Sequence, residues 1–267
     1  MAFRWIRLTM ILLTVAVLAW TTATAENFGQ RKRRPKPHEY GTTLIDTAST
    51  AANIAAVEFP HWLHRSKYTC RLCHVDIGFA MIAGETGITE RDNQRGLYCG
   101  ACHDGTIAFG PKEAKSKKDE PAQENCVRCH SVGQSVEPQI DFYDFRGTVP
   151  RERFGNGIDW VKAEDEGIIK PIDILEGVSF ERRKLMNPND EELTAKEVTM
   201  PSIVFSHTKH TVWNGCEVCH PQIFGVEKGA TKYTMQEIFD GLYCGGCHGK
   251  VSFANEDCQR CHTEPVL

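Results

Sequence analysis

This 267-residue sequence has no cysteine outside one repeated pattern, since all 12 cysteines belong to that pattern. Residues 133–200 contain neither cysteine nor histidine, and after residue 25 no apolar run is long enough to cross a lipid bilayer. No set of side chains is typical of a catalytic nucleophile with its acid or base. A formal net charge of −4 gives no support for nucleic-acid binding. These absences argue against a transmembrane domain and a nucleic-acid partner, and they direct attention to cysteine and histidine.

The first 25 residues (1–25) have the pattern of a secretory signal peptide. Two arginines precede an apolar run from Met10 to Trp20, and we expect cleavage after Ala25. The competing interpretation is an uncleaved anchor helix, for which this run is short. We therefore expect a periplasmic protein, with an extracellular or outer-membrane-associated position as the alternatives. Residues 26–55 form a basic N-terminal segment around RKRRPKP, which we interpret as a solvated tail.

The cysteines form six C-x-x-C-H motifs, and this motif is typical of covalent attachment of c-type haem. On one helical turn the two sulfurs can reach the two vinyl groups of a porphyrin, and the histidine then lies under the iron. The haem-attaching cysteines are Cys70, Cys73, Cys99, Cys102, Cys126, Cys129, Cys216, Cys219, Cys244, Cys247, Cys258 and Cys261. The proximal iron ligands are His74, His103, His130, His220, His248 and His262.

Two other uses of paired cysteines fit the pattern less well. Zinc sites built from Cys and His would need the motifs to combine in spatial pairs, and they would not explain the strict Cys-Cys-His order. Thioredoxin-like redox pairs likewise do not require the histidine. We therefore expect six c-type haems, each with one iron. Because so many haems share one chain, the porphyrins must replace an ordinary apolar core. The fold class expected is mostly irregular, with short α-helices wrapped around the haems.

Five histidines lie outside the motifs, and four of them form two spaced pairs. His61 and His64 follow a phenylalanine in FPHWLH, and His207 and His210 follow one in FSHTKH. A spacing of three places both imidazoles on nearly the same face of a helix. A low-spin haem needs a second axial ligand, so each pair can serve two different irons. The alternative, a pair of surface histidines, is weakened by the repetition of the pattern.

The chain is a tandem duplication, in which each half carries one such histidine pair and then three haem motifs. GLYCGACH matches GLYCGGCH, and ENCVRCH matches EDCQRCH. On these residues each half resembles the triheme c7-type cytochrome domain of the cytochrome c3 superfamily. We expect a first triheme domain at 56–137, a connector at 138–200 and a second triheme domain at 201–267; the two domains are called the first and second repeat below.

The resemblance also implies how the paired histidines are assigned. The first histidine of a pair serves the first haem of its repeat, and the second histidine serves the second haem. His61 and His64 would then ligate the haems at His74 and His103, and the second repeat would follow the same order. There, His207 and His210 would ligate the haems at His220 and His248.

The third haem of each repeat has no histidine left over within its repeat. In the family this ligand comes from the loop before the second motif, and it is His or Met. The second repeat offers Met235 for the haem at His262. The first repeat has Glu90 at the aligned position, and Met81 is the only methionine in that loop. For the haem at His130 we favour Met81, while His38 or an open iron remain the alternatives.

The connector mixes aromatic residues, glycine, proline and many charges, without a clean helical or strand period. A capped helix is suggested only near 188–197, by NPNDEELTAK. We expect the aromatic residues of the connector to pack over haem faces or between the repeats, although a docking surface for a partner is possible. These residues are Phe142, Tyr143, Phe145 and Trp160.

Together these features predict a periplasmic hexahaem cytochrome that carries electrons in anaerobic or extracellular metal respiration. Its partners would be redox proteins, either other cytochromes or a membrane oxidoreductase. One alternative is a reductase that binds a small substrate at an open haem. The other is a subunit of an extracellular cytochrome filament.

Overall fold

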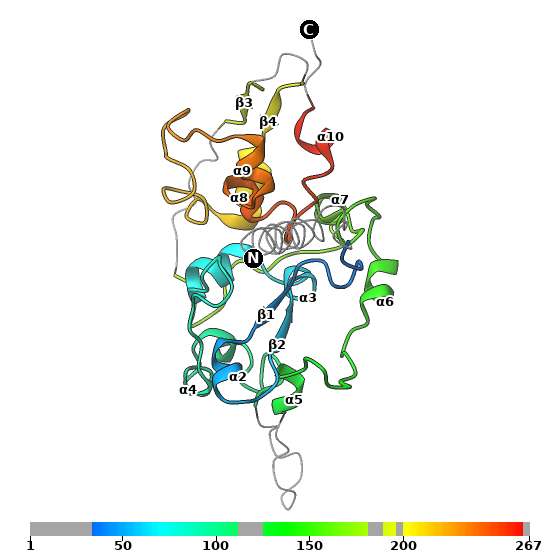
Figure 1. Cartoon of the computed structure of the whole chain (residues 1–267), viewed down its shortest axis with the longest axis vertical. Coiled ribbons are helices and arrows are strands. Elements are labelled where there is room, and N and C mark those ends of the chain that lie inside the picture. Colours follow the sequence, from blue (N-terminus) through cyan, green and yellow to red (C-terminus); the bar gives the residue numbers. More distant parts are fainter. Residues whose placement is uncertain (1–33, 112–124, 181–188, 196–199, 264–267) are drawn as a thin grey trace, which may run out of the picture. The chain divides into compact units, whose positions relative to one another are not determined.

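The structure, a computed structural model, describes residues 34–111, 125–180, 189–195 and 200–263 (Figure 1). The signal peptide and residues 26–33 of the basic segment therefore lie outside the described residues. The chain divides into two compact units, Met1–Pro35 and Lys36–Leu267, and every element described below belongs to the second. In this described part, no helix has the length and apolar character needed to span a membrane.

Regular elements are short, which confirms the mostly irregular fold class with short helices. The helices with α labels are α2 (Thr47–Ala51), α3 (His61–Arg65), α4 (Glu90–Gln94), α5 (Cys126–Cys129), α6 (Phe142–Gly147), α7 (Trp160–Asp165), α8 (His207–Asn214), α9 (Met235–Phe239) and α10 (Cys258–Cys261). Three further helical turns are η1 (Leu72–Ile77), η2 (Tyr98–Ala101) and η3 (Tyr243–Gly246). The strands are β1 (Thr42–Ile45), β2 (Val57–Pro60), β3 (Glu191–Leu193) and β4 (Ile203–Phe205).

Each repeat begins with an antiparallel strand pair that leads directly into the helix carrying the histidine pair. β1 pairs with β2, with Thr42 opposite Pro60, and α3 starts at the next residue, His61. β3 pairs with β4, with Glu191 opposite Phe205, and α8 follows after Ser206. The strand pair thus fixes where each ligand helix starts. β1 comes from the basic segment 26–55 and β3 from the connector, so each first strand lies upstream of the repeat that it supports.

The duplication extends to the turn before the second haem motif. Thr89 and Thr234 each cap a short helix, and in both helices the third residue returns a carboxylate to the cap. The first helical residues are Glu90 and Met235, so the structure supports their alignment. At Gly245, in the second motif of the second repeat, an added Cβ would lie 1.9 Å from the backbone oxygen of Ile238 in α9. Only glycine therefore allows the motif to pack this closely against the helix.

The described apolar core is built largely by the connector. Phe142 and Trp160 are buried there with Trp62 of α3 and Trp213 of α8, one tryptophan from each ligand helix. This packing agrees with aromatic residues lying between the repeats, although Tyr143 of the same group is half exposed. The connector therefore supplies the apolar material that the haem-bearing repeats lack.

Two connector helices were not expected from the sequence. α6 starts after Asp141, whose carboxylate accepts from the backbone N–H of Tyr143 and Asp144. α7 starts after Asp159, which accepts from the N–H of Lys162. Aspartate is a favoured N-cap residue, so this signal was present in the sequence.

The prediction of a helix near 188–197 is wrong within the described residues, because Glu191–Leu193 forms strand β3. Pairing with β4 outweighs the local helix signal. The two residues ahead of the strand also have other partners: the backbone oxygen of Asn189 accepts from His207, and the carboxylate of Asp190 accepts from Ser206. Residues 196–199 lie outside the described part.

We predict that Trp160→Ala lowers the free energy of unfolding by about 3–5 kcal/mol, because it empties the centre of the apolar core. Trp160 is only 5% exposed, whereas Phe180 of the same connector is 71% exposed. The matched control Phe180→Ala should change stability by no more than about 0.5 kcal/mol. Denaturant titrations followed by circular dichroism compare the two variants, and equal midpoints would contradict the connector core.

Candidate haem-binding site

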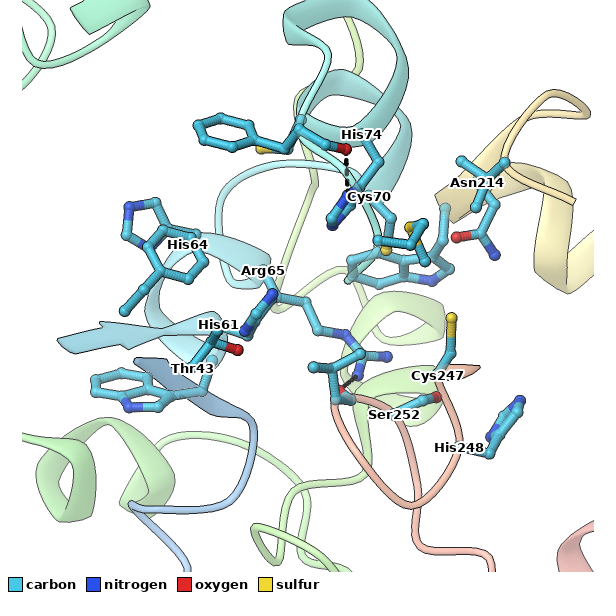
Figure 2. Close-up of a pocket in the computed structure, with 18 of the residues that line it drawn as sticks. Thr43, His61, His64, Arg65, Cys70, His74, Asn214, Cys247, His248 and Ser252 are labelled. Atoms are coloured by element: carbon cyan, nitrogen blue, oxygen red, sulfur yellow. Dashed lines mark hydrogen bonds between the residues drawn. The ribbon is translucent and has the colours of Figure 1, made fainter. Parts of the chain in front are cut away.

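A continuous cavity of about 1690 Å³ runs through the described part of Lys36–Leu267 and is lined by both repeats. Pockets for one small molecule usually enclose about 300–1,000 Å³, so this space exceeds a single-ligand site. Ten of the twelve motif cysteines line it. Figure 2 shows Cys70 and His74 of the first repeat near Cys247 of the second.

The C-x-x-C-H motifs form single helical turns, as expected. In five of the six motifs the backbone N–H of the histidine donates to the carbonyl of the first cysteine, as from His103 to Cys99 at 2.8 Å. The first motif overlaps η1 instead. One turn therefore brings both sulfurs and the imidazole to the same side of the backbone.

The motifs do not combine in the way that zinc would need. Among the described residues, no group of three or more His, Cys, Asp and Glu side chains is placed to hold a metal ion. A zinc site usually takes four such donors. Haem binding does not require the motifs to cluster, because the porphyrin supplies four of the donors to iron.

The ring nitrogens of the histidines provide a direct test of whether these residues fit haem. In nine of the ten histidines predicted as ligands, Nδ1 lies within hydrogen-bond distance of a backbone carbonyl oxygen. The pairs are His61–Gly41, His64–Pro60, His74–Phe79, His103–Phe109, His130–Ala55, His207–Asn189, His210–Ser206, His220–Phe224 and His262–Pro201. A carbonyl can only accept, so Nδ1 carries the proton and Nε2 keeps a free lone pair. This is the tautomer that binds metal through Nε2, and the residues fit haem.

The carbonyls that hold these rings occupy equivalent places in the two repeats. Gly41 and Asn189, just before the first strand of each pair, accept from the first histidine of the helix at 2.7 and 2.8 Å. Ala55 and Pro201, just before the second strand, accept from the histidine of the third motif at 2.7 and 2.6 Å. The short strand pairs therefore orient imidazoles of the first and third haem sites. The sequence carries no local signal for these carbonyl contacts.

His248 is the exception, since its buried Nδ1 forms no hydrogen bond of comparable geometry. Its ring instead packs against Phe253 with the centroids 4.1 Å apart. In the first repeat, the equivalent His103 both packs against Phe109 and bonds to its carbonyl.

The second histidine of each pair faces the histidine of the second motif. The ring centroids of His64 and His103 are 6.2 Å apart, and those of His210 and His248 are 6.1 Å apart. Each metal–imidazole bond is about 2 Å long, so two rings bound to one iron have centroids about 6 Å apart. Both pairs therefore have the spacing of bis-histidine ligation.

The phenylalanine before each histidine pair orients both rings. Phe59 stacks on His64 at 4.3 Å and meets His61 edge-on at 4.8 Å. Phe205 stacks on His210 at 4.3 Å and meets His207 edge-on at 4.9 Å. This packing explains why the sequence pattern includes a phenylalanine at that position.

Burial keeps several of these imidazoles in the neutral form that a metal needs. Desolvation lowers the pKa of His61, His64 and His248 to about 4. The charge of His74 is a further cause of the lowered pKa of His61, so these two rings lie near each other. Desolvation also lowers the pKa of His210.

The candidate methionine ligands of the third haems are partly exposed. Met235 begins α9, Met81 lies in the loop after η1, and each is 43% exposed and lines the cavity. His38 has other partners, because its Nδ1 lies 3.0 Å from the Tyr143 hydroxyl and its Nε2 lies 3.9 Å from a Glu39 carboxylate oxygen.

Comparisons with known proteins were consistent with this geometry. The family model described as cytochrome c7 and related cytochrome c matches residues 57–131 and 203–263, together just over half of the chain. A search of curated proteins gave no significant match.

Three solved structures are similar in sequence. A c7-type three-heme cytochrome domain is 32% identical, with 99% of its length covered by 30% of this chain and a TM-score of 0.27. The C-terminal and N-terminal hexaheme fragments of GSU1996 are 24% and 22% identical. They cover 87% and 84% of this chain over 99% and 98% of their own lengths, with TM-scores of 0.26 and 0.23.

TM-scores this low carry no argument about geometry, so the assignment rests on the family match and the motifs. Six C-x-x-C-H turns account for six c-type haems, three in each matched region. This chain belongs to the cytochrome c7 and related cytochrome c family, and it is a multihaem electron-transfer protein.

Proposed function

We propose that this protein is an exported, periplasmic hexahaem cytochrome that carries electrons in anaerobic or extracellular respiration. The observation that carries the proposal is the set of nine carbonyl-held imidazoles, six of which line a cavity shared by both repeats: His61, His64, His74, His103, His210 and His262. Haem iron supplies the one-electron chemistry, while the polypeptide fixes the positions and potentials of the haems.

The axial ligands follow from the paired geometry. His74, His103, His130, His220, His248 and His262 act as proximal ligands. His64 and His210 act as distal ligands to the irons at His103 and His248, in keeping with their ring distances. His61 and His207 serve the first haem of each repeat, each held by the carbonyl before the strand pair.

The third haem of each repeat takes a thioether ligand in this proposal. Met235 serves the iron at His262, and Met81 serves the iron at His130. His38 is excluded from the ligand set because both of its ring nitrogens already face other polar groups. Thioether ligation favours Fe(II), so these two haems would have higher potentials than the four bis-histidine haems.

Export follows from the signal-peptide pattern and is testable by itself. We predict that the haem-loaded protein is found in the periplasmic fraction and that its polypeptide begins at Glu26. N-terminal sequencing of the fractionated protein measures both. Haem-loaded protein that retains Met1 and sediments with membranes would contradict the periplasmic carrier.

We predict that His210→Ala converts one of the six haems from low-spin to high-spin, because the iron at His248 loses its distal imidazole. Electron paramagnetic resonance of the oxidised protein measures the new high-spin iron. The control is His38→Ala, which removes an imidazole outside the ligand set and should leave every iron low-spin. The ligand scheme fails if the two variants give the same spectrum.

We predict that Met235→His lowers one reduction potential without changing the number of haems, because imidazole stabilises Fe(III) more than a thioether does. A potentiometric titration followed at the α-band reports this potential. Met81→His should produce a second, independent decrease. A titration curve that is unchanged in Met235→His would remove Met235 as a ligand.

A further inference from the structure

Arg65 occupies a position where the duplication is broken. It follows His64 directly at the end of α3, and the corresponding residue after His210 is Thr211. Only the first ligand helix therefore carries a cation at this place. Figure 2 shows its side chain extending between the residues of the two repeats that line the cavity.

The guanidinium of Arg65 is enclosed by three segments of the chain. Its Nη1 donates to the backbone oxygen of Val251 in the second repeat at 2.8 Å. The carbon at its centre lies 4.7 Å from the ring centroid of Trp160 in the connector and 5.0 Å from that of Trp213 in α8. Cation–π contact with two rings compensates part of the cost of removing the charge from water.

What the described residues do not provide is a counter-ion. No Asp or Glu within the described ranges forms an ion pair with Arg65, and its Nε is buried without a hydrogen-bond partner. Arg71 differs, since it pairs with Asp76 at 3.5 Å and with Asp173 at 2.6 Å. Burying a cation is costly unless it is paired, so a group that fills the cavity and carries an anion would stabilise Arg65.

The place of Arg65 identifies which haems are near. The sulfurs of Cys70 and Cys247 lie near its guanidinium, the first from the motif of His74 and the second from the motif of His248. The sulfurs of Cys70, Cys219 and Cys247 also lie near one another, so the motifs of the two repeats approach each other here. We call this place the junction between the repeats.

We propose that Arg65 binds a haem propionate at the junction between the repeats and raises the reduction potential of the haems on either side. The inference rests on the proposed haem electron-transfer function. Each haem brings two carboxylates, and the planar guanidinium is the side chain that best matches a carboxylate. A fixed cation also disfavours the extra positive charge of Fe(III), which favours the reduced state at the junction.

The test compares potentiometric titrations of the full-length haem-loaded protein with Arg65→Gln, Arg65→Lys and the control Arg95→Gln. Arg95 is an exposed cation in the same repeat, so its loss changes the net charge by the same amount without removing a buried cation. Arg65→Gln should shift part of the titration curve to lower potential, and Arg65→Lys should restore part of that shift. Arg95→Gln should leave the curve unchanged. Identical curves for Arg65→Gln and Arg95→Gln would overturn the proposal.

Two further measurements distinguish a failure of this proposal from misfolding of a variant and from a failure of the proposed function. The intact mass of each variant counts its haems, and a wild-type mass without haem would refute the electron-transfer function rather than the role of Arg65. An experimental structure of the haem-loaded wild type should place a propionate oxygen within hydrogen-bond distance of Nε of Arg65. A porphyrin edge or a water in that place would overturn the proposal even if Arg65→Gln failed to fold.

Discussion

The hydrogen bond from imidazole Nδ1 to a backbone carbonyl is the interaction on which the rest of the structure depends. It fixes both the tautomer and the direction of nine of the ten candidate ligand rings. The short strand pairs position these carbonyls, because the carbonyls just before their strands hold imidazoles of the first and third haem sites. A chain with little regular structure can therefore still position metal ligands, provided that a backbone carbonyl meets each ring.

The second constraint is the small amount of apolar core in a chain that encloses six haems. The connector adds to this core by packing Phe142 and Trp160 against Trp62 and Trp213. Each of those tryptophans lies on a ligand helix, next to His61 in one case and three residues after His210 in the other. Core packing and ligand placement are thus coupled through the same two helices. The buried cation of Arg65 lies against this core, where the two repeats meet.

Local patterns predicted the chemistry of the chain well, because covalent attachment and helix periodicity are local properties. The motif turns, the ligand helices at His61 and His207 and the alignment of Glu90 with Met235 all follow from short stretches. Long-range contacts were not accessible in this way. Asp190 has the side chain of a helix cap, yet it accepts from Ser206 beside a strand, and the backbone oxygen of Asn189 holds His207.

Two helices were missed for a different reason. The N-caps Asp141 and Asp159 were visible in the sequence, but the helices behind them are only about two turns long and have no clear apolar period. Burial of Phe142 and Trp160 against distant tryptophans stabilises them, and such partners cannot be deduced from a single segment.

Magnetic circular dichroism of the fully oxidised, haem-loaded protein tests the central claim most directly, because it distinguishes the axial ligand pairs of ferric haem. The carbonyl-held imidazoles and the two thioethers predict six low-spin irons, four with two imidazoles and two with imidazole and thioether. A spectrum dominated by five-coordinate high-spin iron, or by one imidazole and water, would contradict the account of how this chain holds its haems.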